Sequence, residues 1–440
     1  MPEIAPFAAF RYNTEKVDLT DVVAPPYDVI DPEFQDMLYK KHPNNVVRLI
    51  LNKMNPASDT ADNNRYTRSA KALADWKEAG ILIREERPAI YVYHQIYSAF
   101  GKEYVRRGFM CRCKAVPFGE GMVFPHEQTM SGPKMDRLML TTACKTNFSQ
   151  VFGLYPDETN ETQKRLDDAI AAAGLEAYET TDHLGLVHRM WVVTDKTVID
   201  QVVADMEQRP IFIADGHHRY ETACNYRKQL DEQGELTVFH PANYVLMFCI
   251  AMDDPGLLVL PTHRLFRGLP PMTQPELIAK LGEAFTCRDA GEGRTEAGRI
   301  WDEIEKENRQ DTIALYTKKD DRWTLATLTA KGAEMMDTLA AEHHPEWRAL
   351  GVSILHRLIV ETILGQKYDL KDDSTKPTYV HLVQEVVDAL KGDEYQLAAL
   401  VMPATVEHIR VLSLLGDRMP AKSTYFFPKL ISGLVFNPLE

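Results

Sequence analysis

Long apolar runs and cysteine are both scarce in this chain. The longest apolar stretch, residues 244–252, is far shorter than the roughly 20 residues that cross a bilayer. The N-terminus also lacks the basic start and apolar core of a signal peptide. Six cysteines in 440 residues do not make a disulfide framework, and Cys111 and Cys113 are too close together for the usual pair of zinc ligands. We therefore expect a cytoplasmic protein with no membrane segment.

Positive charge is in short supply as well. Lys and Arg number 50 against 64 Asp and Glu, which gives a net charge of -14. Binding of nucleic acid relies on clustered Lys and Arg, so we expect no nucleic-acid partner, while a local basic pocket for a nucleotide stays compatible with this balance. The hydrophobic fraction of 45% and the charged fraction of 26% are those of a soluble globular protein, and this length predicts two or three domains.

Residues 209–226 carry the strongest functional signal. An apolar run, residues 211–214, ends at Asp215 and Gly216, and a helical pattern starts directly afterwards. This order predicts a strand, a tight turn and a helix N-terminus. Glycine lets the backbone approach a ligand closely, and the N–H groups of a first helical turn favour an anion.

The side chains after this turn suit the same chemistry. Arg219 offers a planar fork of donors that matches phosphate oxygens, and His217 and His218 titrate near neutral pH. We interpret residues 215–219 as a phosphate-binding segment. The alternative is that the glycine only makes a turn and the histidine pair only adds polar surface.

Apolar patterning predicts a mixed α/β protein. We expect an N-terminal domain over residues 1–265 that carries this segment, and a mixed helix and strand domain over residues 266–440. The last strand segment is a candidate for packing back on the first domain. Strands are predicted at residues 46–51, 88–97, 104–116, 147–155, 184–193, 211–214, 244–252, 257–260 and 397–402. Residues 22–30 are expected to be a strand that leads into a rigid loop. A turn at Gly101 is expected to join the strands at 88–97 and 104–116, and a turn at 253–256 is expected to make 257–260 the return strand after 244–252. Helices are predicted at residues 66–78, 161–173, 352–364 and 405–415, and after Arg219.

Three further segments carry ionisable side chains. Residues 24–30 form a Pro-Pro loop that holds Tyr27 and Asp28 in a defined place. Residues 124–140 are expected to form a loop, and loops on a scaffold often carry function; its charged residues are His126, Glu127, Lys134, Asp136 and Arg137. The tail offers Lys422, Ser423, Thr424 and Lys429 as contacts for an anion. The simpler interpretations are a solvated loop with a helix N-cap for residues 124–140 and a packed edge strand for the tail.

Several of these segments together resemble one known family. Ala-Asp-Gly-His-His-Arg-Tyr-Glu-Thr-Ala at 214–223, Ala-Pro-Pro-Tyr-Asp-Val-Ile at 24–30 and Met-Pro-Ala-Lys-Ser-Thr-Tyr-Phe-Phe-Pro-Lys at 419–429 look like a bacterial and archaeal family of unknown function. Its members are often labelled SpoOJ/ParA/ParB/RepB-like. With Pro-His-Glu-Gln-Thr at 125–129 and Leu-Pro-Thr-His-Arg at 260–264, the resemblance covers essentially the whole chain.

The segment at 215–219 is also similar to the nucleotide-binding box of the ParB/sulfiredoxin fold. This resemblance implies a ParB/sulfiredoxin-like nucleotide-binding core in which Gly216 is the shared glycine and His218 and Arg219 contact phosphate. His217 stands where sulfiredoxin has its nucleophilic cysteine, which argues against reduction of sulfinic acids. The glutamate of ParB is missing too, which argues against CTP and metal handling in the manner of ParB. The version found in free-serine kinases is the most similar of the three.

Our first hypothesis is a phosphotransferase that uses ATP or ADP with Mg²⁺ and acts on a small hydroxyl compound such as free serine. Phosphoryl transfer needs positioned phosphates, neutralised charge and a base near the acceptor hydroxyl. Asp215 is the candidate ligand of Mg²⁺. The catalytic candidates are Asp28, Glu127 and His217. Lys134, Arg137 and Lys422 are candidates for clamping phosphate or a substrate carboxylate.

Two other classes of protein stay open. The same segment could bind a nucleotide without turnover, as a switch whose closure changes a protein partner or a homodimer interface. A metal-dependent hydrolase would use His126, His217, His218 and His263. Adjacent histidines in a turn rarely coordinate one metal, and this spacing matches no zinc signature.

Overall fold

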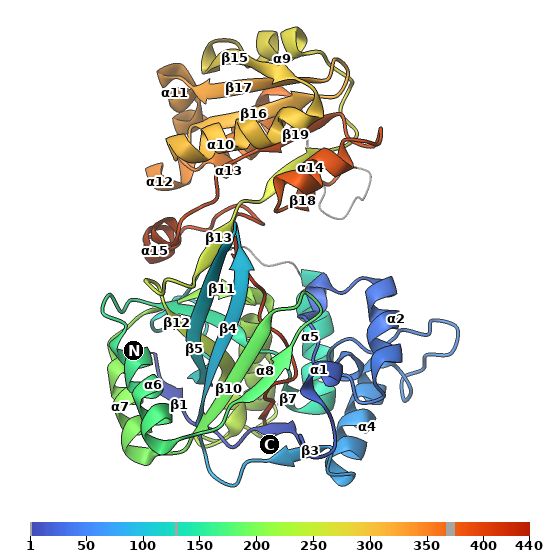
Figure 1. Cartoon of the computed structure of the whole chain (residues 1–440), viewed down its shortest axis with the longest axis vertical. Coiled ribbons are helices and arrows are strands. Elements are labelled where there is room, and N and C mark those ends of the chain that lie inside the picture. The colour runs from blue at the N-terminus through green and yellow to red at the C-terminus, as the bar shows by residue number, and fades with distance from the viewer. Residues whose placement is uncertain (1, 128–130, 367–374) are drawn as a thin grey trace. The chain divides into compact units, whose positions relative to one another are not determined.

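The computed structural model describes residues 2–127, 131–366 and 375–440. The chain forms two compact units, each with its own sheet (Figure 1). Unit 1 contains residues 1–125, 129–257 and 428–440, and unit 2 contains residues 126–128 and 258–427. The mixed α/β fold class expected from the patterning is confirmed.

Unit 1 is built on a nine-stranded mixed sheet. Along the sheet the strand order is β6-β11-β8-β12-β5-β4-β10-β9, and β1 pairs with β5. β11 runs parallel to β6 and antiparallel to β8, so parallel and antiparallel pairs alternate near this edge. The strands are β1 Ile4–Ala5, β4 Ile90–Ala99, β5 Lys102–Lys114, β6 Val123–Pro125, β8 Val151–Tyr155, β9 Tyr178–Thr181, β10 Val187–Val193, β11 Ile211–Asp215 and β12 Tyr244–Ala251.

Helices cover one face of this sheet. Since side chains alternate along a strand, Val92, Phe109, Val151 and Ile213 face one way, and they pack against side chains such as Tyr220 of α8 in one buried cluster. The helices of this layer are α6 Glu161–Ala173, α7 Lys196–Glu207 and α8 His217–Glu232.

The other face of the sheet meets the two ends of the chain. Tyr91 Oη donates to the carbonyl of Phe7 at 2.9 Å, and Gln95 Nε2 donates to the carbonyl of Lys429 at 3.1 Å. A second buried cluster gathers the short N-terminal elements with Phe436. These elements are β2 Phe10–Tyr12, α1 Leu19–Val22, α2 Pro32–Lys41, α3 Val47–Ile50, α4 Arg65–Glu78, β3 Leu82–Arg84 and α5 Ser131–Cys144; two further pairing strands of unit 1 are β7 Thr146–Asn147 and β21 Asn437–Pro438.

Unit 2 is built on a six-stranded sheet in the order β15-β17-β16-β19-β14-β18. Its core joins strand residues such as Leu265, Tyr316 and Trp323 to apolar side chains of α10 and α14. The strands are β14 His263–Phe266, β15 Phe285–Glu292, β16 Thr312–Thr317, β17 Arg322–Leu328, β18 Thr378–Val380 and β19 Leu397–Leu400, with β13 Leu258–Leu260 and β20 Tyr425–Phe427 as a separate pair. The helices are α9 Gln274–Leu281, α10 Ala297–Glu307, α11 Ala330–Leu339, α12 Pro345–Arg348, α13 Gly351–Ser353, a π-helix over Ile354–Ile363, α14 Val383–Ala389 and α15 Val406–Leu414.

The long periodic segments follow the sequence predictions closely. The helix predicted at 161–173 is α6, with its C-cap Gly174 in the left-handed region. The predicted hairpin around Gly101 is confirmed as β4 and β5, which pair Ala99 with Lys102 across a two-residue turn. Phe100 and Gly101 both have positive φ values there, which is the geometry of the turns that suit the twist of a hairpin.

Four predictions from local pattern are wrong in whole or in part. Residues 22–30 contain the expected loop, with one 3₁₀ turn at Tyr27–Val29, but the end of α1 at Val22 stands where the strand was expected. Residues 46–51 form the one-turn helix α3, because the buried Asn45 side chain accepts from the N–H of Val47 and donates to two carbonyls of the preceding segment. Residues 257–260 do not return along β12; they pair with β20. Residues 124–140 form β6 and α5 in place of a loop, apart from residues 128–130, which lie outside the described part.

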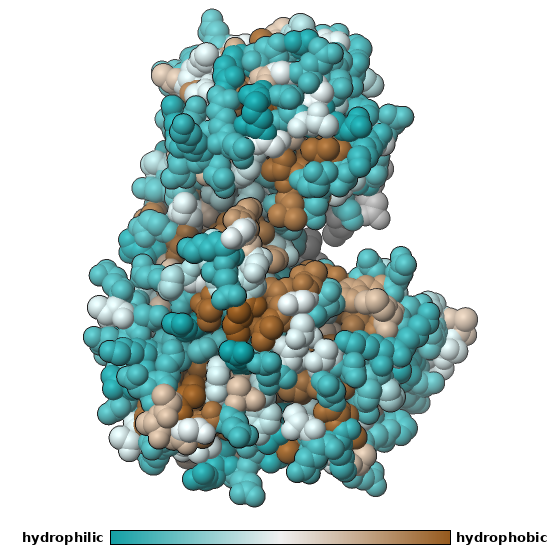
Figure 2. All heavy atoms as spheres, viewed as in Figure 1, coloured by the Kyte–Doolittle hydropathy of each residue, from teal (hydrophilic) through white to brown (hydrophobic). Residues whose placement is uncertain are grey.

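No helix within residues 2–127, 131–366 and 375–440 is both long enough and apolar enough to cross a bilayer. On the face drawn in Figure 2, hydrophilic side chains predominate and apolar ones form separate patches. The six cysteines are free thiols.

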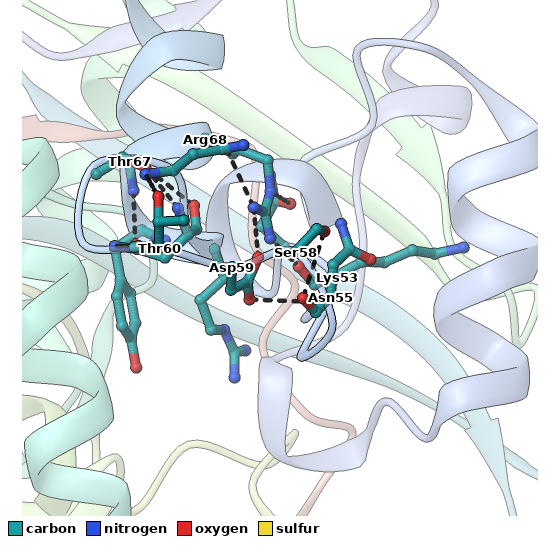
Figure 3. Close-up of polar contacts among 12 residues, drawn as sticks. Lys53, Asn55, Ser58, Asp59, Thr60, Thr67 and Arg68 are labelled. Carbon is teal, nitrogen blue, oxygen red and sulfur yellow. Dashed lines mark hydrogen bonds and ion pairs between the residues drawn. The ribbon is translucent and has the colours of Figure 1, made fainter.

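Arg68 fastens the loop before α4 to that helix (Figure 3). Its guanidinium donates to Asp59 Oδ1 at 2.7 Å and to the carbonyl of Lys53 at 2.7 Å. Two residues earlier, Tyr66 Oη donates to Asp136 Oδ1 of α5 at 2.8 Å. The contacts of Arg68 therefore fix the loop at the start of α4, and Tyr66 of α4 in turn holds the Asp136 carboxylate of α5.

Candidate functional site

The segment singled out in the sequence forms the junction between β11 and α8 (Figure 1). Gly216 is the N-cap of the 16-residue helix α8 and has a φ of 88°, a conformation that glycine adopts without strain. A Cβ at this position would lie 2.8 Å from Cζ of Arg219. The glycine therefore permits both the turn and the close approach of the Arg219 guanidinium to the backbone.

Asp215 and Arg219 form an ion pair across this turn. Arg219 Nη2 lies 2.5 Å from Asp215 Oδ2, and Arg219 Nη1 donates to the carbonyl of Gln150. The second carboxylate oxygen of Asp215 pairs with Lys429 Nζ. Two cations thus converge on one carboxylate at the positive end of a long helix, which is an arrangement suited to anions.

The two histidines of the segment differ in exposure. His217 is buried and His218 is half-buried, and both belong to the first turn of α8. Tyr220, one residue beyond Arg219, is fully buried in the core between sheet and helices. The helix is therefore anchored by its apolar side while its first turn stays at the edge of the sheet.

A second group of side chains approaches Arg219 from α5 and the Pro-Pro loop. The guanidinium carbon of Arg137 lies 4.0 Å from the centre of the Tyr27 ring. Arg137 also donates to Asp136 Oδ2 at 2.8 Å and to the carbonyl of Ile50 at 2.7 Å. Burial raises the pKa of Tyr27, while the positive charges of Arg137 and Arg219 oppose that shift.

A narrow cavity of about 40 Å³ lies among these groups. A cavity needs about 10–15 Å³ to hold one water, so this space accepts a few waters and a larger ligand enters only when the site opens. Its walls include Tyr27, Arg137, Thr141, Ser149, Arg219 and Thr222.

Lys134 and Asp28 lie apart from this cavity. Lys134 Nζ pairs with Glu221 Oε2 of α8 at 3.1 Å and lines a different hollow of about 430 Å³ beside Phe118 and Cys224. Asp28 is exposed in the 3₁₀ turn after the two prolines. The structure thus groups Arg137 with the α8 segment and places Lys134 on the side of that helix.

Glu127 and Lys422 belong to unit 2. Glu127 Oε1 accepts from the N–H of Ser423 at 3.2 Å, and the adjacent His126 Nε2 lies 2.9 Å from Thr424 Oγ1. Lys422 is exposed and has a φ of 61°. Glu127 and Lys422 are therefore close to each other, because Glu127 bonds to Ser423, the residue after Lys422. Both belong to unit 2, whereas the α8 segment belongs to unit 1.

Two contacts of the site, Gln150 and Tyr27, were absent from the predicted binding residues, whereas Lys429 was predicted as an anion contact in the tail. Gln150 contributes a backbone carbonyl, for which a sequence holds no signal. Tyr27 was visible as the residue fixed by two prolines, and Lys429 as a cation in the tail. Lys429 stands 214 positions from Asp215, and only the path of the last segment places it there. Among the described residues, no group of three or more His, Cys, Asp or Glu side chains is arranged to hold a metal ion.

These features define a mixed α/β protein with a strand–glycine–helix junction in unit 1, at which Arg219 and Lys429 both pair with Asp215. The chain belongs to the family described as a protein of unknown function, DUF1015, which it matches over residues 4–353. No curated protein matches the chain.

Solved structures show weak likenesses. A mutant free serine kinase in complex with AMP has a TM-score of 0.34 and 12% identity, covering 69% of this chain and 84% of that chain. A conserved hypothetical protein from Pyrococcus furiosus has a TM-score of 0.34 and 13% identity, covering 71% and 91%. SbnI with a C-terminal truncation from Staphylococcus aureus has a TM-score of 0.33 and 10% identity, covering 75% and 87%. Similarity at this level assigns no activity to the chain.

Proposed function

We propose that this protein binds ATP or ADP at the start of α8 and transfers a phosphoryl group between the nucleotide and a small hydroxyl compound, with free serine as the first acceptor to test. The observation that carries the proposal is the turn at Gly216, where Arg219 folds back over the N-terminus of α8 and meets the same carboxylate as Lys429. Helix N–H groups and paired cations are the parts that position phosphates in phosphoryl transfer.

The remaining roles follow from chemistry and placement. Mg²⁺ is usually held by one or two carboxylates together with phosphates and water. Asp215 would supply one carboxylate to the ion once Arg219 or Lys429 turns to the nucleotide. Asp28, exposed beside Tyr27, is our candidate for the base that accepts the proton of the acceptor hydroxyl. His217, in the first turn of α8, remains the second candidate.

One observation favours a second function, a nucleotide-binding switch without turnover. Arg219 is already bonded to Asp215 and to the Gln150 carbonyl, and the adjoining cavity holds about 40 Å³. Binding would therefore require these contacts to break and the site to open. Such a rearrangement could be the functional output in itself.

The test is a calorimetric titration of the full chain with ATP, ADP, CTP and GTP, each with and without Mg²⁺. Arg219→Ala should weaken binding of the preferred nucleotide by about 1.5–3 kcal/mol, the value of a hydrogen bond to a charged group. The matched control is Lys196→Ala, which removes an exposed cation from α7 and should leave the affinity unchanged. Equal affinity in folded Arg219→Ala would exclude the phosphate role of Arg219.

Turnover separates the two candidate functions. Phosphorus NMR with ATP or ADP and serine should reveal a new phosphoryl ester if the protein is a phosphotransferase. Tight binding without turnover across a panel of hydroxyl acceptors would favour the switch. Absence of binding to every nucleotide would exclude both.

A further inference from the structure

Unit 1 buries a guanidinium in the middle of its sheet. Arg106 of β5 has no exposed surface, and its Cζ lies 5.0 Å from the centre of the Phe152 ring. Burial lowers the pKa of Arg106 to about 10, so the side chain is still charged at neutral pH. A buried cation is costly unless its donors are satisfied, which makes its partners informative.

The partners of Arg106 hold the last segment of the chain. Arg106 Nε donates to Gln95 Oε1 at 2.9 Å, and Arg106 Nη2 donates to the carbonyl of Pro428. Gln95, the register partner of Arg106 on β4, donates from Nε2 to the carbonyl of Lys429 at 3.1 Å. Two successive backbone carbonyls are thus fastened to two side chains that share one face of the sheet.

These two hydrogen bonds to the backbone place Lys429 beside the α8 segment. Lys429 Nζ pairs with Asp215 Oδ1, and Asp215 Oδ2 pairs with Arg219 at 2.5 Å. The side chain of Lys429 is 17% exposed, so its ammonium group is within reach of a ligand. A point charge and a planar fork therefore flank one carboxylate, and these two cations bind phosphate in complementary ways.

We propose that Lys429 is a phosphate-binding residue of the nucleotide site, and that Arg106 and Gln95 are positioning residues that hold its backbone in place. The proposal rests on the proposed function, since it assumes a nucleotide at the start of α8. The Asp215 carboxylate occupies the position between Lys429 and Arg219 in the unliganded protein. An entering phosphate takes over both cations and releases Asp215.

The first experiment compares ADP binding to the full chain by calorimetry in wild type, Lys429→Met and Lys429→Arg. Loss of one charged hydrogen bond should weaken ADP roughly ten- to a hundredfold in Lys429→Met, and Lys429→Arg should restore part of the affinity. Lys145→Met is the matched control, because Lys145 is an exposed cation of unit 1 that pairs with Glu440 at 3.2 Å.

A second variant separates positioning from stability. Gln95→Glu keeps an acceptor for Arg106 but has no amide to donate to the carbonyl of Lys429. ADP binding should fall severalfold while the unfolding temperature stays near that of wild type. If Gln95→Glu fails to fold, Arg106→Lys, which keeps the buried charge and a donor for Gln95 Oε1, takes its place with the same two measurements. Wild-type affinity in the folded variant would overturn the positioning role.

A third measurement needs no variant. ADP should protect the Lys429 amine of wild-type protein from acetylation by acetic anhydride, read by mass spectrometry. Binding of ADP with unchanged affinity in Lys429→Met and no protection would overturn this inference and leave the proposed function standing. Absence of ADP binding to wild type would overturn both.

Discussion

At the scale of residues, Gly216 and Arg219 depend on each other. The left-handed backbone at Gly216 turns the chain from β11 into α8, and the missing Cβ leaves the space that the Arg219 guanidinium fills. Any larger residue at 216 would meet that guanidinium at less than 3 Å. A substitution there should therefore strain the backbone and also displace the Arg219 guanidinium, which we propose binds phosphate.

Gly216→Ala should destabilise the protein by about 1–2 kcal/mol from the left-handed backbone alone. It should also displace Arg219 and weaken nucleotide binding. Gly174→Ala is the matched control, because Gly174 has a φ of 58° and no atom within 4 Å of an added Cβ. Chemical denaturation and ADP titration should show similar losses of stability for both variants but a loss of affinity for Gly216→Ala alone. Equal affinities would contradict the link between Gly216 and Arg219.

At the scale of elements, β14 carries a buried histidine that is not part of the α8 site. His263 has no exposed surface and packs edge-on against Trp301 at 4.7 Å between ring centres. Neither of its ring nitrogens has a hydrogen-bond partner within the described part of the chain. Burial, with the charge of Arg264 adding to it, lowers the pKa of His263 to about 3.

This histidine should make the protein sensitive to acid. Its folded pKa lies below the ordinary value of 6.5, so the unfolded chain binds the proton more readily. The contribution of neutral His263 to the free energy of unfolding is complete above pH 6.5. It is lost as the pH falls toward 3, by roughly 1 kcal/mol per pH unit. Urea unfolding at pH 7.5 and 5 should show a smaller difference for His263→Phe than for wild type. His344→Gln, at an exposed histidine of the same unit, should behave like wild type.

At the scale of the whole molecule, the last 13 residues belong to unit 1 although the residues just before them belong to unit 2. Leu430, Ile431, Val435 and Phe436 of this segment are buried. Phe436 packs with Tyr12 and Phe148 at ring distances of 5.9 and 5.7 Å. The segment therefore completes the core of unit 1 and carries Lys429 with it.

Deletion of residues 428–440 should lower the unfolding temperature strongly or leave the chain insoluble, because it removes several fully buried apolar side chains, each of which contributes about 1.5–3 kcal/mol. Deletion of Glu440 alone, an exposed residue, should have little effect. Thermal unfolding followed by circular dichroism measures both. A long truncation as stable as the full chain would show that unit 1 does not need this segment.

Local sequence signals predicted the elements whose stabilising contacts are themselves local. The helix at 161–173, the hairpin around Gly101 and the strand–glycine–helix order at 211–219 were all expected, and each depends on periodicity or turn chemistry within a few residues. Residues 46–51 show the limit of such signals. Their β-branched and apolar side chains predicted a strand, yet the buried Asn45 side chain favours a helical turn through contacts with residues 21 and 23.

The sequence by itself therefore determined the mixed α/β class and the tight turn at Gly216 between a strand and a helix. Contacts between distant segments were decided only by the tertiary structure. Lys429 reaches Asp215 across 214 positions because Arg106 and Gln95, neighbours on adjacent strands, hold the returning backbone. The physical reason is range: turn and helix preferences act within a few residues, whereas the path of this segment depends on how the sheet is assembled and on which of its faces the segment buries.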